Sequence, residues 1–294
     1  LYNKPRTLSE CFGSTSWEMS LEIQKTLIDW QVAHGGVNLF TPHDHSYSIE
    51  GRRKRDHPPA FNHYSCYPKM HVLNDYIGRL CYLFSLPRGS ELPRVGVIYG
   101  NQTVLASMNP GMGQNAYEAH DTLPYLVDLL QRFHVDFDIL PEQYISTLQV
   151  SNGLLSDGVN HYDLIISPSL EVFWDSTFQK LIEFYEMGGA ILFIRKLPSF
   201  ALQRHLIDPK VLPNSSTVDY CARLKSLVEQ SQTNSQDQGS MQLLAAPELP
   251  VFKNQIGNLL LSHIDKFHQK EHAVLAVGGK HNGDIILRRH DVRQ

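Results

Sequence analysis

The stretch YDLIISPSLEVFWDSTFQKLIEFYEMGGAILFI, residues 162–194, contains a complete strand–helix–strand unit. YDLIISPS is a short apolar run of the kind that forms a buried strand, and AILFI at 190–194 is a second one. Between them, STFQKLIEFYEMG has apolar residues at helical spacing and ends at Gly188 and Gly189, which favour a helix terminus. Two buried strands joined by a helix predict a parallel pair.

The same alternation continues on the N-terminal side of this unit. VGVIY (95–99) and VDFDIL (135–140) have the composition of buried strands, and the amphipathic segment 120–134 between them predicts a helix. We therefore predict a doubly wound parallel sheet domain over residues 94–213. It has neither a GxxxxGK[ST] phosphate loop nor a nucleophile elbow, so we expect it to do no chemistry of its own.

The first part of the chain has two further strand–helix pairs. TLSECF (7–12) predicts a strand, and Ser20 is a suitable cap for the helix SLEIQKTLIDWQVAHG. VNLFTP (37–42) predicts a second strand, and the helix at 70–86 follows after a long polar loop. Two such pairs resemble the end of a (β/α)8 barrel but cannot close one, since a barrel needs about 200 residues.

Three regions follow from these patterns. Residues 1–88 are predicted to be the C-terminal portion of a catalytic barrel whose other strands lie outside this chain, and LPRGSELPR (86–94) separates them from the 94–213 domain. Residues 214–294 are predicted to hold a polar insertion, a helix and the first strand, GDIILRR, of a β-sandwich. Within them the Gln-rich run SLVEQSQTNSQDQGSMQ (226–242) is predicted to be a loop.

Composition excludes several classes of function. The net charge of −4, from 26 Lys and Arg against 30 Asp and Glu, gives no overall field that attracts nucleic acid or anionic membranes. No apolar run approaches the roughly 20 residues that span a bilayer. The four cysteines lie far apart without a CxxC pair, so we expect ordinary buried thiols, with one disulfide left open.

Two groups of residues that suit catalysis or binding follow the predicted barrel strands. In α/β barrels the loops after the strands build the active site. Glu10 follows the first strand and is a candidate for one of the two carboxyl groups that glycoside hydrolysis requires. A helix cap or an ion pair is the alternative role for this carboxylate.

The loop NLFTPHDHSYSIEGRRKRDHPPAF (38–61) is the second group. His43 and His45 form an H-x-H pair, which suits metal ligands, sugar-contacting side chains or simple loop histidines. The run GRRKRD is flanked by acids and has no interleaved aromatic residues, so we expect it to pin the loop through ion pairs rather than to bind nucleic acid.

The first 85 residues also carry motifs of a known family. S-E-x-F-G, G-V-N-L-F, P-H-x-x-x-Y-S-I and the G-R-R-K-R-D-x-P-P run resemble the barrel end of glycoside hydrolases related to the α-L-rhamnosidases of family 106. The resemblance implies a catalytic (β/α)8 barrel, a flavodoxin-like α/β domain at 94–213 and β-sandwich domains. It implies an oligosaccharide or glycoside substrate and a calcium requirement, for which the chain suggests no ligands.

The resemblance also implies roles for individual side chains. It makes Glu10 the catalytic carboxylate, acting as general base if the chemistry is inverting. His43 and Tyr47 of the P-H-x-x-x-Y motif would face the sugar, and Trp17 and Tyr67 are candidates for stacking on its ring. His45, where the family often has an aromatic residue, is a further candidate for contact with the sugar.

Two other classes of function stay open at this point. The chain suits a noncatalytic carbohydrate-binding or assembly protein, which would have no second carboxylate opposite Glu10. It also suits a metal-dependent hydrolase, in which His43 and His45 would bind the metal.

Overall fold

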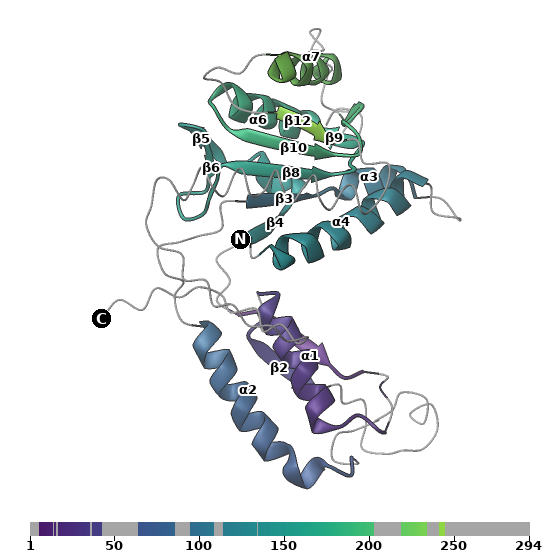
Figure 1. Cartoon of the computed structure of the whole chain (residues 1–294), viewed down its shortest axis with the longest axis vertical. Coiled ribbons are helices and arrows are strands. Elements are labelled where there is room, and N and C mark those ends of the chain that lie inside the picture. Colours follow the sequence, from purple (N-terminus) through teal and green to yellow (C-terminus); the bar gives the residue numbers. More distant parts are fainter. Residues whose placement is uncertain are drawn as a thin grey trace, which may run out of the picture. The chain divides into compact units, whose positions relative to one another are not determined.

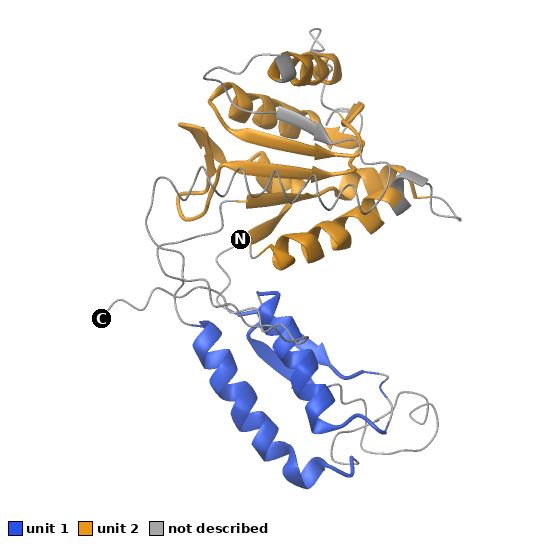
Figure 2. Ribbon diagram, in the orientation of Figure 1, with its two compact units in different colours: residues 1–90, 280–294 blue, residues 91–279 orange. Residues whose placement is uncertain are grey.

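The computed structural model describes residues 6–13, 15, 17–35, 37–42, 64–85, 95–108, 114–133, 135–202, 219–233 and 241–244. The chain divides into two compact units (Figure 2). The N-terminal unit comprises residues 1–90 and 280–294, and the second unit comprises residues 91–279. Each unit is described by itself below.

Two short parallel strands form the sheet of the N-terminal unit. β1 (Leu8–Cys11) pairs with β2 (Leu39–Pro42), and Ser9 is opposite Phe40 while Glu10 is opposite Thr41. Because successive strand residues point to opposite faces, Ser9 and Cys11 share one face and Leu8 and Glu10 share the other. The predicted strands and their parallel pairing are confirmed.

Two helices pack against the Ser9 and Cys11 face. α1 (Leu21–Ala33) begins at its cap Ser20, whose Oγ accepts a hydrogen bond from the Ile23 amide at 3.2 Å, as predicted. A 3₁₀ turn, η3 (Tyr67–Lys69), leads into α2 (Met70–Ser85). The buried core of this unit consists of Cys11, Phe12, Met19, Ile28, Val32, Tyr64, Met70 and Leu73.

The second unit is built on a five-stranded sheet whose strands lie side by side in Figure 1. The strands are β3 (Val95–Tyr99), β4 (Phe137–Pro141), β8 (Leu164–Pro168), β10 (Ala190–Ile194) and β12 (Met241–Leu244). Their order is β12-β10-β8-β3-β4, and every neighbouring pair is parallel. The predicted α/β class with a parallel sheet is confirmed.

Helices cover both faces of this sheet. α4 (Gln114–Arg132) packs Leu126, Leu129 and Leu130 against one face. α6 (Asp175–Glu186) packs Phe178 and Leu181 against the other, where α7 (Tyr220–Thr233) joins the same core. Since both faces are covered, the central strands are mainly apolar, and β8 and β10 are buried at every position.

Shorter elements surround the sheet, and the sequence patterns did not predict them. They are α3 (Asn101–Ala106), α5 (Glu142–Ile145), an antiparallel group of β5 (Gln149–Ser151), β6 (Leu154–Ser156) and β7 (His161–Tyr162), and the parallel pair β9 (Val172–Trp174) and β11 (Phe200–Leu202). None of the described helices is long and apolar enough to span a bilayer.

The end of α6 is stabilised by a tandem glycine turn. Gly188 has φ +98°, and its amide donates to the Tyr185 carbonyl at 3.0 Å. The amide of Gly189 donates to the Phe184 carbonyl at 2.9 Å, which completes a Schellman motif. The predicted helix stop at these two glycines is confirmed, and the chain then enters β10.

The prediction of a loop over residues 226–242 is wrong for its two ends. Residues 226–233 belong to α7, in which Leu224 and Val228 are buried one turn apart. Met241 begins β12, which pairs with β10 at the edge of the sheet. The predicted β-sandwich strand GDIILRR lies outside the described residues.

The prediction of buried thiols is correct for Cys11 only. All four thiols are free, and Cys11 is buried while Cys66, Cys81 and Cys221 are half-buried. The disulfide that the sequence left open is absent from these four described positions.

Candidate functional site

Glu10 lies in β1 on the face of the sheet that α1 and α2 do not cover. On the helix-covered face, the Ser9 hydroxyl donates to Gln31 Oε1 at 2.6 Å, and Gln31 Nε2 donates to Cys11 Sγ at 3.3 Å. Glu10 alternates with these residues and is exposed. Glu10 lies within β1 and is not itself the N-cap residue of α1, which is Ser20.

The neighbours of Glu10 on this face are also exposed. Leu8 and its register partner Leu39 are 58% and 40% exposed, although both are large and apolar. Parallel sheets are usually buried on both faces. In the described part of the N-terminal unit, the face that bears Glu10 is therefore an uncovered one with mixed apolar and acidic character.

Trp17 lies between β1 and α1, at the carboxyl end of β1. Its ring is 39% exposed and lies 6.1 Å from the ring of Tyr64, measured between centroids. Tyr64 is buried, and its hydroxyl accepts a hydrogen bond from the Met19 amide at 3.0 Å. Tyr64 thus fixes the segment that carries Trp17.

Tyr67 comes after β2 along the chain, beyond residues 43–63, which lie outside the described residues. It opens η3 and is 49% exposed. Glu10 thus lies near the carboxyl end of β1, Trp17 follows β1 along the chain, and Tyr67 precedes α2. The structure adds Tyr64 as the aromatic neighbour of Trp17. The sequence patterns did not predict this residue, because its burial depends on tertiary packing.

The remaining predicted site residues, His43, His45 and Tyr47, lie outside the described residues, as does the GRRKRD run. Their roles stay predictions. Among the residues that the structure does describe, no three His, Cys, Asp or Glu side chains lie together in a way that could hold a metal ion.

The second unit has a polar cluster at the carboxyl ends of its strands. Ser169 and Arg195 follow β8 and β10, and both have positive φ, of 51° and 69°. Lys196 pairs with Glu118 of α4 at 2.8 Å, and the Ser169 hydroxyl lies 3.5 Å from the same carboxylate oxygen. Ser169 is fully buried. This cluster ties α4 to two strand ends.

A buried carboxylate lies at the end of β4. Glu142 Oε1 accepts hydrogen bonds from the Trp174 amide at 2.6 Å and from the Thr177 hydroxyl at 3.2 Å. Burial raises the pKa of Glu142 to about 7, although these donors and the Gln102 amide act in the opposite direction.

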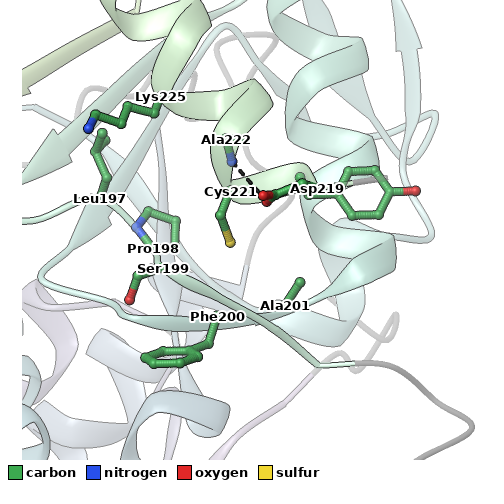
Figure 3. A pocket seen from close by; sticks show the side chains of 10 residues that line it. Leu197, Pro198, Ser199, Phe200, Ala201, Asp219, Cys221, Ala222 and Lys225 are labelled. Atoms are coloured by element: carbon green, nitrogen blue, oxygen red, sulfur yellow. Dashed lines mark hydrogen bonds between the residues drawn. The ribbon is translucent and has the colours of Figure 1, made fainter. Parts of the chain in front are cut away.

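An open hollow of about 480 Å³ lies beside the N-terminus of α7 (Figure 3). One wall is the segment 197–201, and the other is formed by residues 219–222 with Lys225. Asp219 caps α7, because its Oδ1 accepts a hydrogen bond from the Ala222 amide at 3.0 Å. Burial and the neighbouring Asp219 and Asp175 carboxylates raise the pKa of Cys221, so its thiol is not activated as a nucleophile.

Comparison with known proteins gave a match only among solved structures. No family model matches the chain, and no curated protein matches it. The chain is similar to an apo exo-carrageenase GH42 from Bacteroides ovatus, with 9% identity and a TM-score of 0.46 over 86% of this chain and 28% of that one.

Two β-galactosidases give similar results. A catalytic mutant of a GH42 β-galactosidase from G. stearothermophilus has 16% identity and a TM-score of 0.42 over 58% of this chain and 24% of that one. A β-galactosidase from Halorubrum lacusprofundi has 14% identity and a TM-score of 0.39 over 59% and 24%. The chain thus spans about a quarter of the length of these structures, and the neighbours are glycoside hydrolases at low identity.

Proposed function

We propose that this chain is part of a glycoside hydrolase and that Glu10 is one of its catalytic carboxylates. The observation that carries the proposal is the position of Glu10, which is exposed on the uncovered face of β1, in register with β2 and close to the carboxyl ends of both strands. Barrel enzymes carry catalytic side chains at strand ends of this kind.

The N-terminal unit has the features of a slice through a (β/α)8 barrel. Two parallel strands are each followed by a helix, and both helices pack on the same face of the sheet. In a closed barrel the opposite face points to the interior and is covered by the other strands. The exposed Leu8 and Leu39 side chains suit such a covered position. The missing barrel strands are thus the proposed partners of this unit.

The second unit supports a flavodoxin-like assignment through its strand order. Numbered along the chain, the five parallel strands lie in the order 2-1-3-4-5, which is the order of flavodoxin-like sheets. The finer resemblance to the family 106 α-L-rhamnosidases rests on the motifs of the first 85 residues. A rhamnoside is accordingly the first substrate to test.

In the proposed reaction Glu10 acts on water. As a general base in an inverting mechanism, its carboxylate takes a proton from the water that attacks the anomeric carbon. A second carboxylic acid on another barrel strand gives its proton to the leaving oxygen, about 6.5 to 9.5 Å away. Trp17 and Tyr67, whose rings are partly exposed, are proposed to stack on the sugar. His43, His45 and Tyr47 are proposed to bind its hydroxyl groups.

The calcium requirement implied by the family resemblance stays a proposal. Calcium takes six to eight oxygen ligands. The described residues offer no cluster of three acidic or histidine side chains for it. No step of the proposed reaction is therefore routed through a metal.

The test compares aryl glycoside hydrolysis by the protein with its complete barrel and by its Glu10→Gln variant. The panel includes the α-L-rhamnoside, and Glu22→Gln is the matched control because Glu22 is an exposed acid in the first turn of α1. We expect Glu10→Gln to reduce kcat by at least about 10³-fold, with the fold intact by circular dichroism and with Glu22→Gln unchanged.

Two results would count against this assignment. If Glu10→Gln retains activity, Glu10 has a structural role and not a catalytic one. No activity from any variant on the whole panel, together with binding of oligosaccharides by calorimetry, favours the noncatalytic carbohydrate-binding or assembly protein. Loss of binding in Trp17→Ala would then identify the same face as the binding surface.

A further inference from the structure

Among the described residues, Glu142 is the only Asp, Glu, Lys or Arg that is completely buried. It follows the last residue of β4 and is the first residue of α5. A lone carboxylate in a protein interior is unfavourable unless it is paired or hydrogen-bonded. The groups that surround it therefore decide its state.

Two hydrogen-bond donors at the start of α6 converge on this carboxyl group, and α3 also acts on it. The Trp174 amide at the start of α6 donates to Oε1 at 2.6 Å, and the Thr177 hydroxyl in the first turn of α6 donates to the same oxygen at 3.2 Å. The backbone amide of Gln102 in α3 also acts to lower the pKa of this carboxyl group. Glu142 thus links the end of β4 to the beginnings of α3 and α6.

The second oxygen of the group is different. Glu142 Oε2 is buried, and no described residue hydrogen-bonds to it. A protonated carboxyl group loses less by such burial than a carboxylate does, because only the carboxylate carries a full charge.

Among the residues that the structure describes, no counter-charge compensates the buried carboxylate. The ionisable side chains on or next to the elements that pack around it are Asp136, Asp138, Tyr144, Glu171, Asp175, Lys180, Glu183, Tyr185 and Glu186. The cation in this set, Lys180, pairs with Glu183 at 2.8 Å on the outer side of α6. α3 contains no ionisable side chain.

We propose that Glu142 is a pH-sensitive latch in the second unit. In its protonated form it holds the first turn of α6 and the start of α3 against the end of β4. When it loses its proton near neutral pH, the buried charge favours an opened form in which water reaches the carboxylate. The first turn of α6 then separates from β4, while the sheet below it stays intact.

The direction of this effect follows from linkage. The pKa of Glu142 is about 7 in the closed form, against 4.5 for an exposed glutamate. A raised carboxyl pKa means that the closed form binds more protons, so closing is favoured below about pH 4.5 and weakens as pH rises to about 7. Between pH 5 and pH 8 the equilibrium shifts toward opening on the order of 50-fold.

Hydrogen exchange followed by NMR on the whole chain tests this latch. The reporters are the Trp174 amide, which donates to Glu142, and the Phe178 amide in the first turn of α6. Protection factors are compared rather than raw rates, because intrinsic exchange is itself base-catalysed. We expect both protection factors to fall on the order of 50-fold from pH 5 to pH 8 in the wild type.

Two variants separate the latch from general effects of pH. In Glu142→Gln the side chain cannot ionise, so the protection factors of these two amides are expected to change less than about 3-fold over the same range. Glu183→Gln removes an exposed acid from the same helix and is expected to behave like the wild type. Equal protection at pH 5 and pH 8 in the wild type, or the same fall in Glu142→Gln, overturns the proposal.

A direct titration keeps the proposal testable if Glu142→Gln does not fold. The carboxyl carbon of Glu142 in wild-type protein labelled with ¹³C-glutamate is followed by NMR from pH 3 to pH 9. A midpoint close to 7 supports the latch, and a midpoint close to 4.5 contradicts it.

Discussion

Replacing Gly189 by alanine tests the packing of the α6 terminus more sharply than any other single change in the second unit. A Cβ atom at this position would lie 2.2 Å from Cε2 of Phe184 and 2.4 Å from Cδ2 and Cζ. Carbon atoms in normal contact are about 3.5 to 4.0 Å apart. The Phe184 ring is completely buried and rigid, so it has little free space to move into.

The magnitude follows from this overlap. Ring and methyl group must separate by more than about 1 Å, and overpacking of a buried core costs about 1 to 3 kcal/mol. We expect Gly189→Ala to reduce the free energy of unfolding by about 3 kcal/mol. In a Phe184→Leu background the methyl group has room, and the same change is expected to cost less than about 1 kcal/mol.

The assay is urea denaturation of the four variants of this double-mutant cycle. Trp174 fluorescence is followed in a Trp17→Phe/Trp30→Phe background, because the chain has three tryptophans and the other two lie in the N-terminal unit. An interaction energy of about 2 kcal/mol between positions 184 and 189 is expected. If the two substitutions are additive within about 0.5 kcal/mol, the steric argument is refuted.

Three further predictions concern other parts of the chain. Gly78→Ala in α2 is expected to raise the free energy of unfolding of the N-terminal unit by about 0.5 to 1 kcal/mol, because a Cβ there meets nothing within 4 Å. Thermal unfolding followed by circular dichroism measures this change, and a lower stability of the variant would contradict the prediction. Tyr64→Phe leaves the buried Met19 amide without its acceptor. It is expected to destabilise the N-terminal unit by about 1 to 3 kcal/mol in urea titrations. No change in stability would mean that the amide finds another acceptor. Burial acts to raise the pKa of Asp157, but the Tyr144 hydroxyl and two backbone amides hold it well below 3.8. The stabilisation by the Asp157 carboxylate is therefore complete above pH 3.8 and is lost as the pH falls further. Asp157→Asn is expected to flatten the decrease in melting temperature below about pH 4, and a decrease equal to that of the wild type would refute this.

The elements that sequence patterns predicted are those with local signals. Ser20 caps α1 through a bond that spans three residues, and the Gly188 and Gly189 pair ends α6 within a single turn. The strands β3, β8 and β10 are continuous apolar runs, which distinguishes buried parallel strands from one-sided ones.

The elements that were missed depend on tertiary contacts. α7 buries only Leu224 and Val228 fully, and its second half is rich in polar residues, so the composition of that half is typical of a loop. β12 contains four residues and becomes a strand because β10 offers it a free edge. Propensity alone does not identify segments of this kind.

The candidate site divides in the same way. The sequence patterns predicted that Glu10 lies at the end of a parallel strand, and β1 pairs with β2 as expected. Its catalytic role and the roles of His43, His45 and Tyr47 stay predictions. The burial of Glu142 could not be predicted, because a glutamate after a proline has the pattern of an ordinary first-turn residue. Its environment arises only when the sheet brings α3 and α6 together.

The strand order of the second unit also has a consequence for protein synthesis. β4 pairs with β3, β8 then pairs with the other edge of β3, β10 pairs with β8, and β12 pairs with β10. Each strand therefore finds its neighbour already made when it leaves the ribosome, and no strand must wait for a later one. The sheet can therefore assemble in the direction of translation. Each newly made strand pairs with the edge strand that is exposed at that moment and covers it.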